Sequence, residues 1–340
     1  MKKTLTYKKT PLLLLVLFLT ASGYAQDLHF SQFFEAPLLR NPSLAGIYTG
    51  DIRVQAVYRD QWNSITSAYK TASINGEYKM PIGKANDFLT AGMQVLYDQA
   101  GTVALKTTHV LPALNYHKSL SNEVNRYLSI GFMGGLVQNR FDRSKITTDG
   151  TYNGTGDGEN FPSPQFSYFD AAAGISFNTQ LNDNVDNNMF VGVAYHHFNR
   201  PKKSFYGDQS AELTPKVVTS AGIKFSVTEV SYLTIQGDYS KQGDFQEIIG
   251  GAMYGVKLGD DYEKPKYTIH GGVFMRLNDA IIPVIKLDYR PFSVSFSYDA
   301  NISKLKASTM GRGGFEIGIS YVGFRKSKEE APNFSLCPRF

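Results

Sequence analysis

The chain has 340 residues, a formal charge of +5 at neutral pH and a single cysteine, Cys337. Four of its 35 basic side chains fall within residues 1–25, so the rest of the chain carries 31 basic and 30 acidic side chains. This near-neutral balance gives no reason to expect a nucleic-acid partner. One cysteine excludes an intrachain disulfide, and no apolar run after residue 25 is long enough for a membrane-spanning helix.

Residues 1–25 have the pattern of a secretory signal peptide. A basic start is followed by an apolar run from Pro11 to Leu19, and the small residues Gly23 and Ala25 stand ahead of a cleavage site before Gln26. A membrane anchor would need about 20 apolar residues, and this run is about half as long. We therefore expect an exported protein.

Residues 26–50 precede the first expected strand and are rich in phenylalanine and proline. Phe30, Phe33 and Phe34 recur with nearly helical spacing, and Pro37 is expected to stop any helix before it. The result is a short, turn-rich segment whose aromatic side chains need a cover. This makes the three phenylalanines candidate partner-binding residues.

From residue 51 onward, apolar and polar residues alternate. In the sequence DIRVQAVYR, Ile52, Val54 and Tyr58 point to one face, while Arg53 and Gln55 point to the other. Most runs of this kind have about ten residues, the length that a tilted membrane strand needs. Fourteen strands are expected, at residues 51–59, 69–80, 88–97, 108–117, 127–138, 168–177, 189–198, 217–227, 230–240, 247–258, 267–276, 281–289, 292–299 and 313–324.

The connections favour a closed transmembrane antiparallel β-barrel over a large secreted sandwich. Long connections such as 139–167 and 199–216 join the same ends of the strands, and the other ends are joined by turns as short as 228–229. An even strand number with long outer loops and short periplasmic turns is typical of outer-membrane barrels, in which closure leaves no edge facing lipid. Pro112 and Pro283 fit least well, since proline in a strand suggests a bulge or a misplaced boundary.

Both ends of the mature chain are expected in the periplasm, because the strand number is even. The expected organisation is a signal peptide at 1–25, a periplasmic or plug segment at 26–50, the barrel at 51–324 and a periplasmic tail at 325–340. Residues 26–50 would then close the periplasmic mouth of the barrel or dock a partner there. The tail contributes three further candidate partner-binding residues, Cys337, Arg339 and Phe340.

Residues for catalysis or metal binding are sparse. No HExxH or G-x-S-x-G motif occurs, so we expect neither an enzyme nor a cofactor. Strand alternation places His196 and His197 on opposite faces, which argues against shared chelation. In the longest loop, Asp149, Asp157 and Glu159 are weak candidates for calcium, whose preferred ligands are oxygens, although their spacing is not that of an EF-hand.

The stretch FNRPKKSFYGD, residues 198–208, places Arg200, Lys202 and Lys203 beside aromatic residues on the outward side of the expected barrel. Lipid is the expected neighbour of the barrel wall. At this stretch we weigh contact with anionic lipopolysaccharide or with a protein partner against an ordinary solvated basic loop.

Several stretches, in this order, resemble the PorP/SprF family of type IX secretion system outer-membrane proteins. They are DLHFSQFFEAPLLRNPSLAG after the leader, YRDQW at 58–62, SYDANISKL at 297–305, GRGGFEIGISY at 311–321 and the final CPRF. The resemblance covers residues 26–340. It implies an outer-membrane barrel of Bacteroidota whose partners are the secretion machinery and cargo proteins with C-terminal sorting domains, often adhesins used in gliding motility. It carries over no catalytic residue, and the cargo stays open.

Two classes of function follow. The first is an accessory barrel of type IX secretion that binds cargo or machinery through its loops, lumen and periplasmic ends. The second is a channel or transporter for small or hydrophobic solutes, since a fourteen-stranded barrel is wide enough for a pore or a plug. Steady, solute-selective conductance would favour the second and a closed barrel the first.

Overall fold

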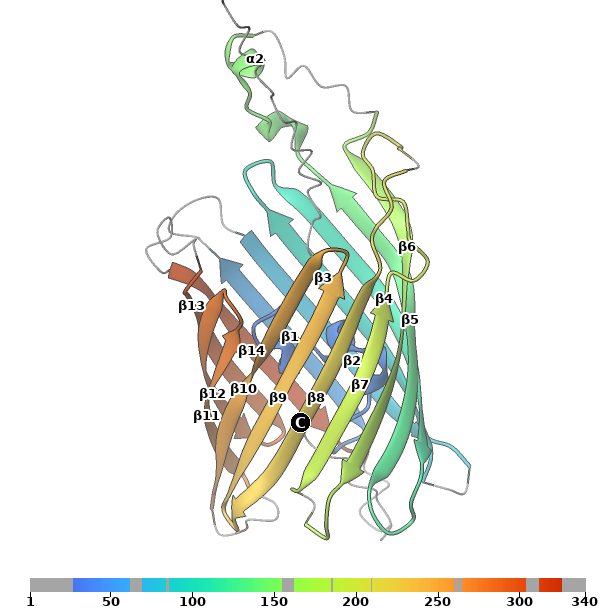
Figure 1. The fold of residues 1–340 in the computed structure, drawn as a ribbon, viewed down its shortest axis with the longest axis vertical. Coiled ribbons are helices and arrows are strands. Elements are labelled where there is room, and N and C mark those ends of the chain that lie inside the picture. The colour runs from blue at the N-terminus through green and yellow to red at the C-terminus, as the bar shows by residue number, and fades with distance from the viewer. Residues whose placement is uncertain are drawn as a thin grey trace, which may run out of the picture.

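The computed structural model describes residues 27–61, 69–83, 86–154, 162–184, 186–208, 210–259, 261, 265–303 and 312–325. Its strands form one closed antiparallel barrel in which each strand pairs with its sequence neighbours and the last pairs with the first (Figure 1). The expected fourteen-stranded barrel is confirmed. The strands are β1 (Ile52–Gln61), β2 (Tyr69–Pro81), β3 (Phe88–Ala100), β4 (Leu105–Ser119), β5 (Arg126–Arg140), β6 (Gln165–Gln180), β7 (Asn188–His196), β8 (Lys216–Thr228), β9 (Ser231–Gln242), β10 (Phe245–Leu258), β11 (Tyr267–Arg276), β12 (Ala280–Tyr289), β13 (Phe292–Asn301) and β14 (Arg312–Gly323).

The two faces of the wall differ as the alternation predicts. On β1, Ile52, Val54 and Tyr58 are exposed on the outside, whereas Arg53 and Gln55 between them are buried inside the barrel. An apolar exterior suits lipid, and inward polar side chains need partners within the lumen. Within the described part of the chain, no helix has the length and apolar character needed to span a membrane.

Pro112 and Pro283 both lie inside strands. Pro112 pairs with Met93 on one side, but the ladder from β4 to β5 is interrupted at this position and resumes in the same register. The ladder from β12 to β13 is interrupted in the same way at Pro283. Since proline lacks a backbone N–H, each residue weakens the pairing to one neighbour without inserting a bulge or ending the strand.

The connections sort into two ends. The end that we call the long-loop end is where β5 and β6 are connected, and η3 (Arg143–Lys145) and α2 (Asp149–Tyr152) of this connection stand above the barrel in Figure 1. The opposite, short-turn end carries tight turns such as 290–291 between β12 and β13. At that end a hydrogen bond also joins the residues next to the first and last strands, since the Arg325 backbone N–H donates to Asp51 Oδ2 over 2.9 Å.

Residues 27–51, which we call the lumen segment, lie inside the barrel (Figure 1). The segment contains η1 (Phe33–Glu35), α1 (Pro37–Arg40) and η2 (Pro42–Leu44). As expected, the helical turn before Pro37 ends ahead of it, at Glu35, and Pro37 itself begins a new helix, α1. Proline is well tolerated at the first position of a helix, where its missing N–H would have no intrahelical partner.

Candidate functional site

The lumen segment runs from one end of the barrel to the other. Asp27 lies beside Gln242, the last residue of β9 at the long-loop end, and its N–H is 3.3 Å from Gln242 Oε1. At the short-turn end, the Asp51 N–H donates to Gly323 O over 2.9 Å. The segment was expected in the mouth next to the first strand, and it instead spans the lumen.

A carboxylate from β14 holds the backbone of the lumen segment. Glu316 accepts from the N–H groups of Ser31 and Gln32, both over 2.7 Å. Arg59 Nε lies 3.3 Å from the same carboxylate. Glu316 is fully buried, and a buried carboxylate is tolerated when it is paired and hydrogen-bonded in this way. Glu316 of β14 therefore joins the backbone of the lumen segment to Arg59 of β1.

A second carboxylate extends this contact to β11 and β13. Asp299 accepts from Ser31 Oγ over 2.8 Å and is paired with Arg59 at 3.1 Å and Arg276 at 2.6 Å. Arg59 also donates to the carbonyl of His29 over 2.7 Å. We call Arg59, Arg276, Asp299 and Glu316 the ionic clamp. Its four members come from four strands and converge on residues 29–32 of the segment.

Arg40 anchors the middle of the lumen segment to β9. Its guanidinium makes two contacts with the Asp238 carboxylate, of 2.8 and 2.5 Å. It also lies over the rings of Phe33 and Phe190, 4.6 and 5.4 Å from their centroids. Planar two-point pairing and stacking are properties of arginine that lysine lacks.

The phenylalanines of the lumen segment face the barrel wall. Phe33 and Phe34 pack against Phe274 of β11, with ring centroids 5.5 and 5.2 Å away. Phe30 packs with Val57 and neighbouring apolar residues. All three are at least 93% buried, so partner binding through these rings stays a prediction that requires the segment to leave its seat. The other three candidates, Cys337, Arg339 and Phe340, lie outside the described residues.

The sequence NPS at residues 41–43 sits on glycines of the wall. A Cβ added at Gly131 would lie 2.5 Å from the backbone of Pro42 and Ser43. Added at Gly174 or Gly192, it would collide with the Asn41 side chain. These glycines on β5, β6 and β7 therefore permit the segment to approach the wall closely.

Asn115 on β4 completes this seat from the side. Its Nδ2 donates to the carbonyls of Ser43 and Ala45 over 2.6 and 2.8 Å. Asn41 in turn accepts from the N–H and hydroxyl of Ser43 over 2.8 and 2.7 Å. The backbone of this tight turn thus finds its partners inside the lumen, as buried polar groups require.

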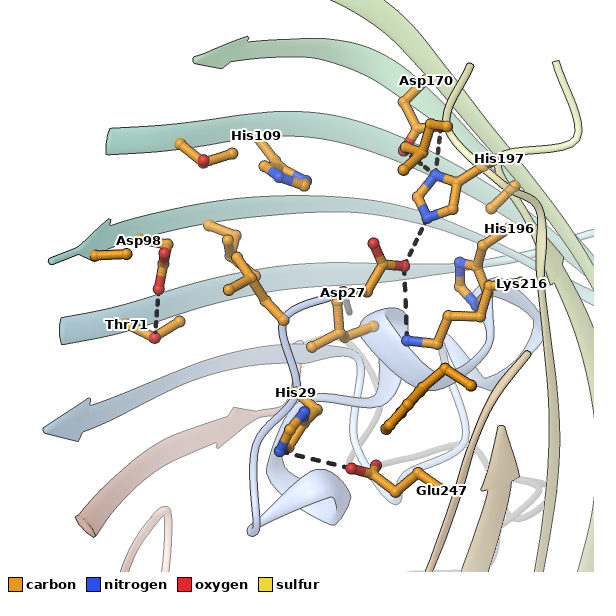
Figure 2. A pocket seen from close by; sticks show the side chains of 18 of the residues that line it. Asp27, His29, Thr71, Asp98, His109, Asp170, His196, His197, Lys216 and Glu247 are labelled. Carbon is orange, nitrogen blue, oxygen red and sulfur yellow. Dashed lines mark hydrogen bonds and ion pairs between the residues drawn. The ribbon is translucent and has the colours of Figure 1, made fainter. Parts of the chain in front are cut away.

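At the long-loop end, a histidine lies between two carboxylates (Figure 2). His197 Nδ1 lies 2.8 Å from Asp170 Oδ1, and Nε2 lies 2.7 Å from Asp27 Oδ2. Lys216 Nζ is 3.7 Å from the same Asp27 oxygen. Burial disfavours the charged imidazole, but the two carboxylates outweigh it and raise the pKa of His197 to about 9. Burial also opposes ionisation of Asp27, yet Lys216 and His197 hold its pKa well below the usual range.

The expectation that His196 and His197 face opposite sides was wrong. His196 is the last residue of β7, and His197 has a left-handed backbone with φ of 56°. This turn brings both side chains inward, where His196 Nε2 lies 3.2 Å from the Arg40 carbonyl. Strand alternation fails here because the strand ends between the two residues.

Two cavities lie on either side of the lumen segment. The outer cavity has a volume of about 770 Å³ and is lined by residues including Asp27, His197 and Gln94. The inner cavity, towards the short-turn end, has a volume of about 390 Å³ and is lined by residues including Glu35 and Gln55. The two share no lining residue, so the segment divides the lumen.

The described residues contain no group of three or more histidine, cysteine or acidic side chains arranged to hold a metal ion. Of the calcium candidates, Asp149 begins α2. Asp157 and Glu159 lie outside the described residues.

Comparison with known proteins shows the family of this barrel. The model of the family described as type IX secretion system membrane protein PorP/SprF matches residues 22–321. The chain belongs to this family. In this PorP/SprF protein, the matched region contains the whole lumen segment and thirteen complete strands, with β14 matched up to Tyr321.

Solved structures share the fold of this PorP/SprF protein at low sequence identity. The toluene transporter TbuX of Ralstonia pickettii matches with a TM-score of 0.50 and 10% identity, over 86% of this chain and 94% of that one. The toluene transporter TodX of P. putida gives 0.50 and 10%, over 84% and 93%. No curated protein sequence matches the chain.

Sequence reasoning selected the aromatic residues of the opening motif and missed its polar ones. Ser31, Gln32, Arg40 and Asn41 are each at least 94% buried. Their regular presence among apolar residues was the available signal, because a polar side chain in a segment that must be covered implies a partner. What those partners are could not be read from the motif.

Proposed function

We propose that this barrel is an outer-membrane component of the type IX secretion system that supports the secretion or surface attachment of cargo proteins, including adhesins used in gliding. The family match over residues 22–321 carries the proposal. In this role the protein needs no catalytic residue, and its partners are the secretion machinery and the C-terminal sorting domains of cargo.

The proposed orientation puts the long-loop end outside the cell and the short-turn end in the periplasm, after cleavage of residues 1–25. The division of loop lengths between the two ends supports this orientation. Cargo would then meet the β5–β6 and β7–β8 connections, where lipopolysaccharide is a further proposed neighbour. The machinery would meet the periplasmic turns and the tail at 325–340, with Cys337, Arg339 and Phe340 as proposed contacts.

The proposal is tested by deleting the gene and quantifying proteins at the cell surface and in the medium. We expect one or a few proteins with a type IX sorting domain to fall at the surface, and the full chain supplied in trans to restore them. A chain lacking residues 326–340 should insert normally and fail to restore them if the tail docks the machinery. Unchanged levels of every such protein in the deletion strain would contradict the proposal.

A solute channel is the second candidate, and the outer cavity of about 770 Å³ is the observation that favours it. Deleting residues 27–46 separates the two roles of the lumen segment. If the segment is a plug, the shortened barrel should conduct ions in a planar bilayer when the full chain does not. If it is a docking surface, conductance should stay unchanged and cargo secretion should fall.

A further inference from the structure

A row of polar side chains on the wall connects the two cavities behind the lumen segment. Gln55 on β1 pairs in register with Asn75 on β2, which pairs with Gln94 on β3. Gln55 lines the inner cavity and Gln94 lines the outer one. Since neighbouring strands are about 4.8 Å apart, the row crosses between the cavities in about 10 Å.

These side chains are buried, and most of their polar atoms have no protein partner. Gln55, Asn75 and Gln94 are 4%, 1% and 0% exposed. Among the described residues, no partner exists for either amide atom of Asn75, for either amide atom of Gln94 or for Gln55 Oε1. The remaining atom, Gln55 Nε2, donates to Glu35 of the lumen segment over 3.0 Å. Five unpaired polar atoms are therefore concentrated in one row.

The lumen segment presents apolar groups on both sides of this row. Ala36 packs with Val57 and Leu96, the inward residues one step nearer the long-loop end. On the other side, Leu38 Cδ1 lies 3.6 Å from the position of a Cβ on Gly92. Neither Ala36 nor Leu38 carries a side-chain hydrogen-bonding group, so their side chains offer the row no partner.

Buried amide groups in folded proteins are hydrogen-bonded to protein or to ordered water, and each buried water needs two to four polar partners. We propose that a file of water molecules lies along Gln55, Asn75 and Gln94 and joins the two cavities, so that the seated lumen segment leaves a narrow path for water. Because Ala36 and Leu38 flank the row closely, the path is too narrow for sugars. This inference concerns permeation and does not depend on the proposed role in secretion.

The test uses the full mature chain reconstituted in lipid vesicles, with osmotic water permeability measured by stopped-flow light scattering. The wild-type barrel should raise permeability above that of protein-free vesicles, while sucrose stays excluded. Asn75→Leu should remove at least four-fifths of this increase, because it replaces two of the row's polar atoms with an apolar side chain. Heat-modifiable migration on gels confirms that each variant forms a barrel.

Gln94→Met is the second variant, since it keeps the shape of the side chain and removes its polar atoms. Asn178→Leu is the matched control: Asn178 is fully buried on β6 and lines neither cavity. It should leave permeability unchanged. The proposal is overturned if wild-type permeability equals that of protein-free vesicles, if Gln94→Met or a folded Asn75→Leu retains it, if Asn178→Leu lowers it equally, or if sucrose enters.

Discussion

Two asparagines face the lumen segment from different parts of the wall and meet different surfaces. Asn115 on β4 donates to the carbonyls of Ser43 and Ala45. Asn75 on β2 has no partner for either amide atom within the described part of the chain. Both asparagines are buried, but Asn115 is hydrogen-bonded to the segment, whereas Asn75 needs water as its partner. The difference arises because the segment presents backbone carbonyls to Asn115 and apolar side chains beside Asn75.

The same contrast extends to the strands around each asparagine. On β5 to β7, glycines let the NPS turn approach the wall, and a Cβ at Gly131 would have no room. On β1 to β3, the row of Gln55, Asn75 and Gln94 has one hydrogen bond to the segment, which Gln55 donates to Glu35. We infer that hydrogen bonds hold the segment at β4–β7, at the ionic clamp and at Glu77 of β2, which accepts from the Gly46 N–H over 2.6 Å, and that they are sparse along the row on β1–β3.

The largest effect is expected at the ionic clamp. Glu316→Ala removes the acceptor of two backbone N–H groups and one partner of buried Arg59, and should lower the free energy of unfolding by about 3–5 kcal/mol. Urea unfolding in lipid vesicles measures the loss, and protease cleavage within the lumen segment should increase. Glu212→Ala, which breaks an exposed pair with Lys202, is the control and should leave the free energy of unfolding nearly unchanged, because solvent screens exposed ion pairs. Equal effects would disprove the role of the clamp.

The contact between His197 and Asp27, at the start of the lumen segment, should respond to pH. The folded protein raises the pKa of His197 to about 9, so the stability from its proton is complete below pH 6.5 and is lost as the pH rises through 9, by up to about 3 kcal/mol. Asp27, Asp170, Lys216 and His196 surround the group. Protease access to the segment's first residues should increase between pH 7 and 9.5.

His197→Gln supplies the control for the contact between His197 and Asp27. It keeps a hydrogen-bonding side chain and removes the titration, so access should be high at pH 7 and change little up to pH 9.5. A wild-type profile that is flat over this range would show that His197 does not hold the segment.

Adding a side chain to a wall glycine that the NPS turn contacts should have a smaller effect on stability. Gly131→Ala places a methyl group against the backbone of Pro42 and Ser43 and should cost about 1–3 kcal/mol through displacement of the turn. Gly76→Ala is matched, because a Cβ on Gly76 has no atom within 4 Å, and it should be nearly neutral. If both variants unfold at the same urea concentration, the close fit on β5 is not an important contact.

The smallest difference in stability is expected between variants of the two asparagines, Asn115 and Asn75. Asn115→Leu removes two hydrogen bonds and leaves the Ser43 and Ala45 carbonyls unpaired, which should cost about 1–3 kcal/mol. Asn75→Leu removes amide atoms that have no protein partner and should change stability by less than about 1 kcal/mol. Equal losses in urea unfolding would mean that the two sides of the lumen are held alike.

The alternation along the chain determined the barrel, the number of its strands and the direction in which most side chains point. This information is local, because lipid outside and polar groups inside impose a two-residue period on each strand. The order of the motifs along the chain likewise indicates the PorP/SprF family. It also located a segment ahead of β1 that needed a cover.

Only the tertiary structure decided what covers that segment. Ser31 meets Glu316 across 285 residues of sequence, and closure of the barrel alone brings them together. The left-handed backbone at His197 and the start of α1 at Pro37 depend on where a strand or helix ends, which a repeating pattern does not specify. A sequence pattern reports which side of a strand faces inward, whereas the packed lumen determines which inward residue finds a partner.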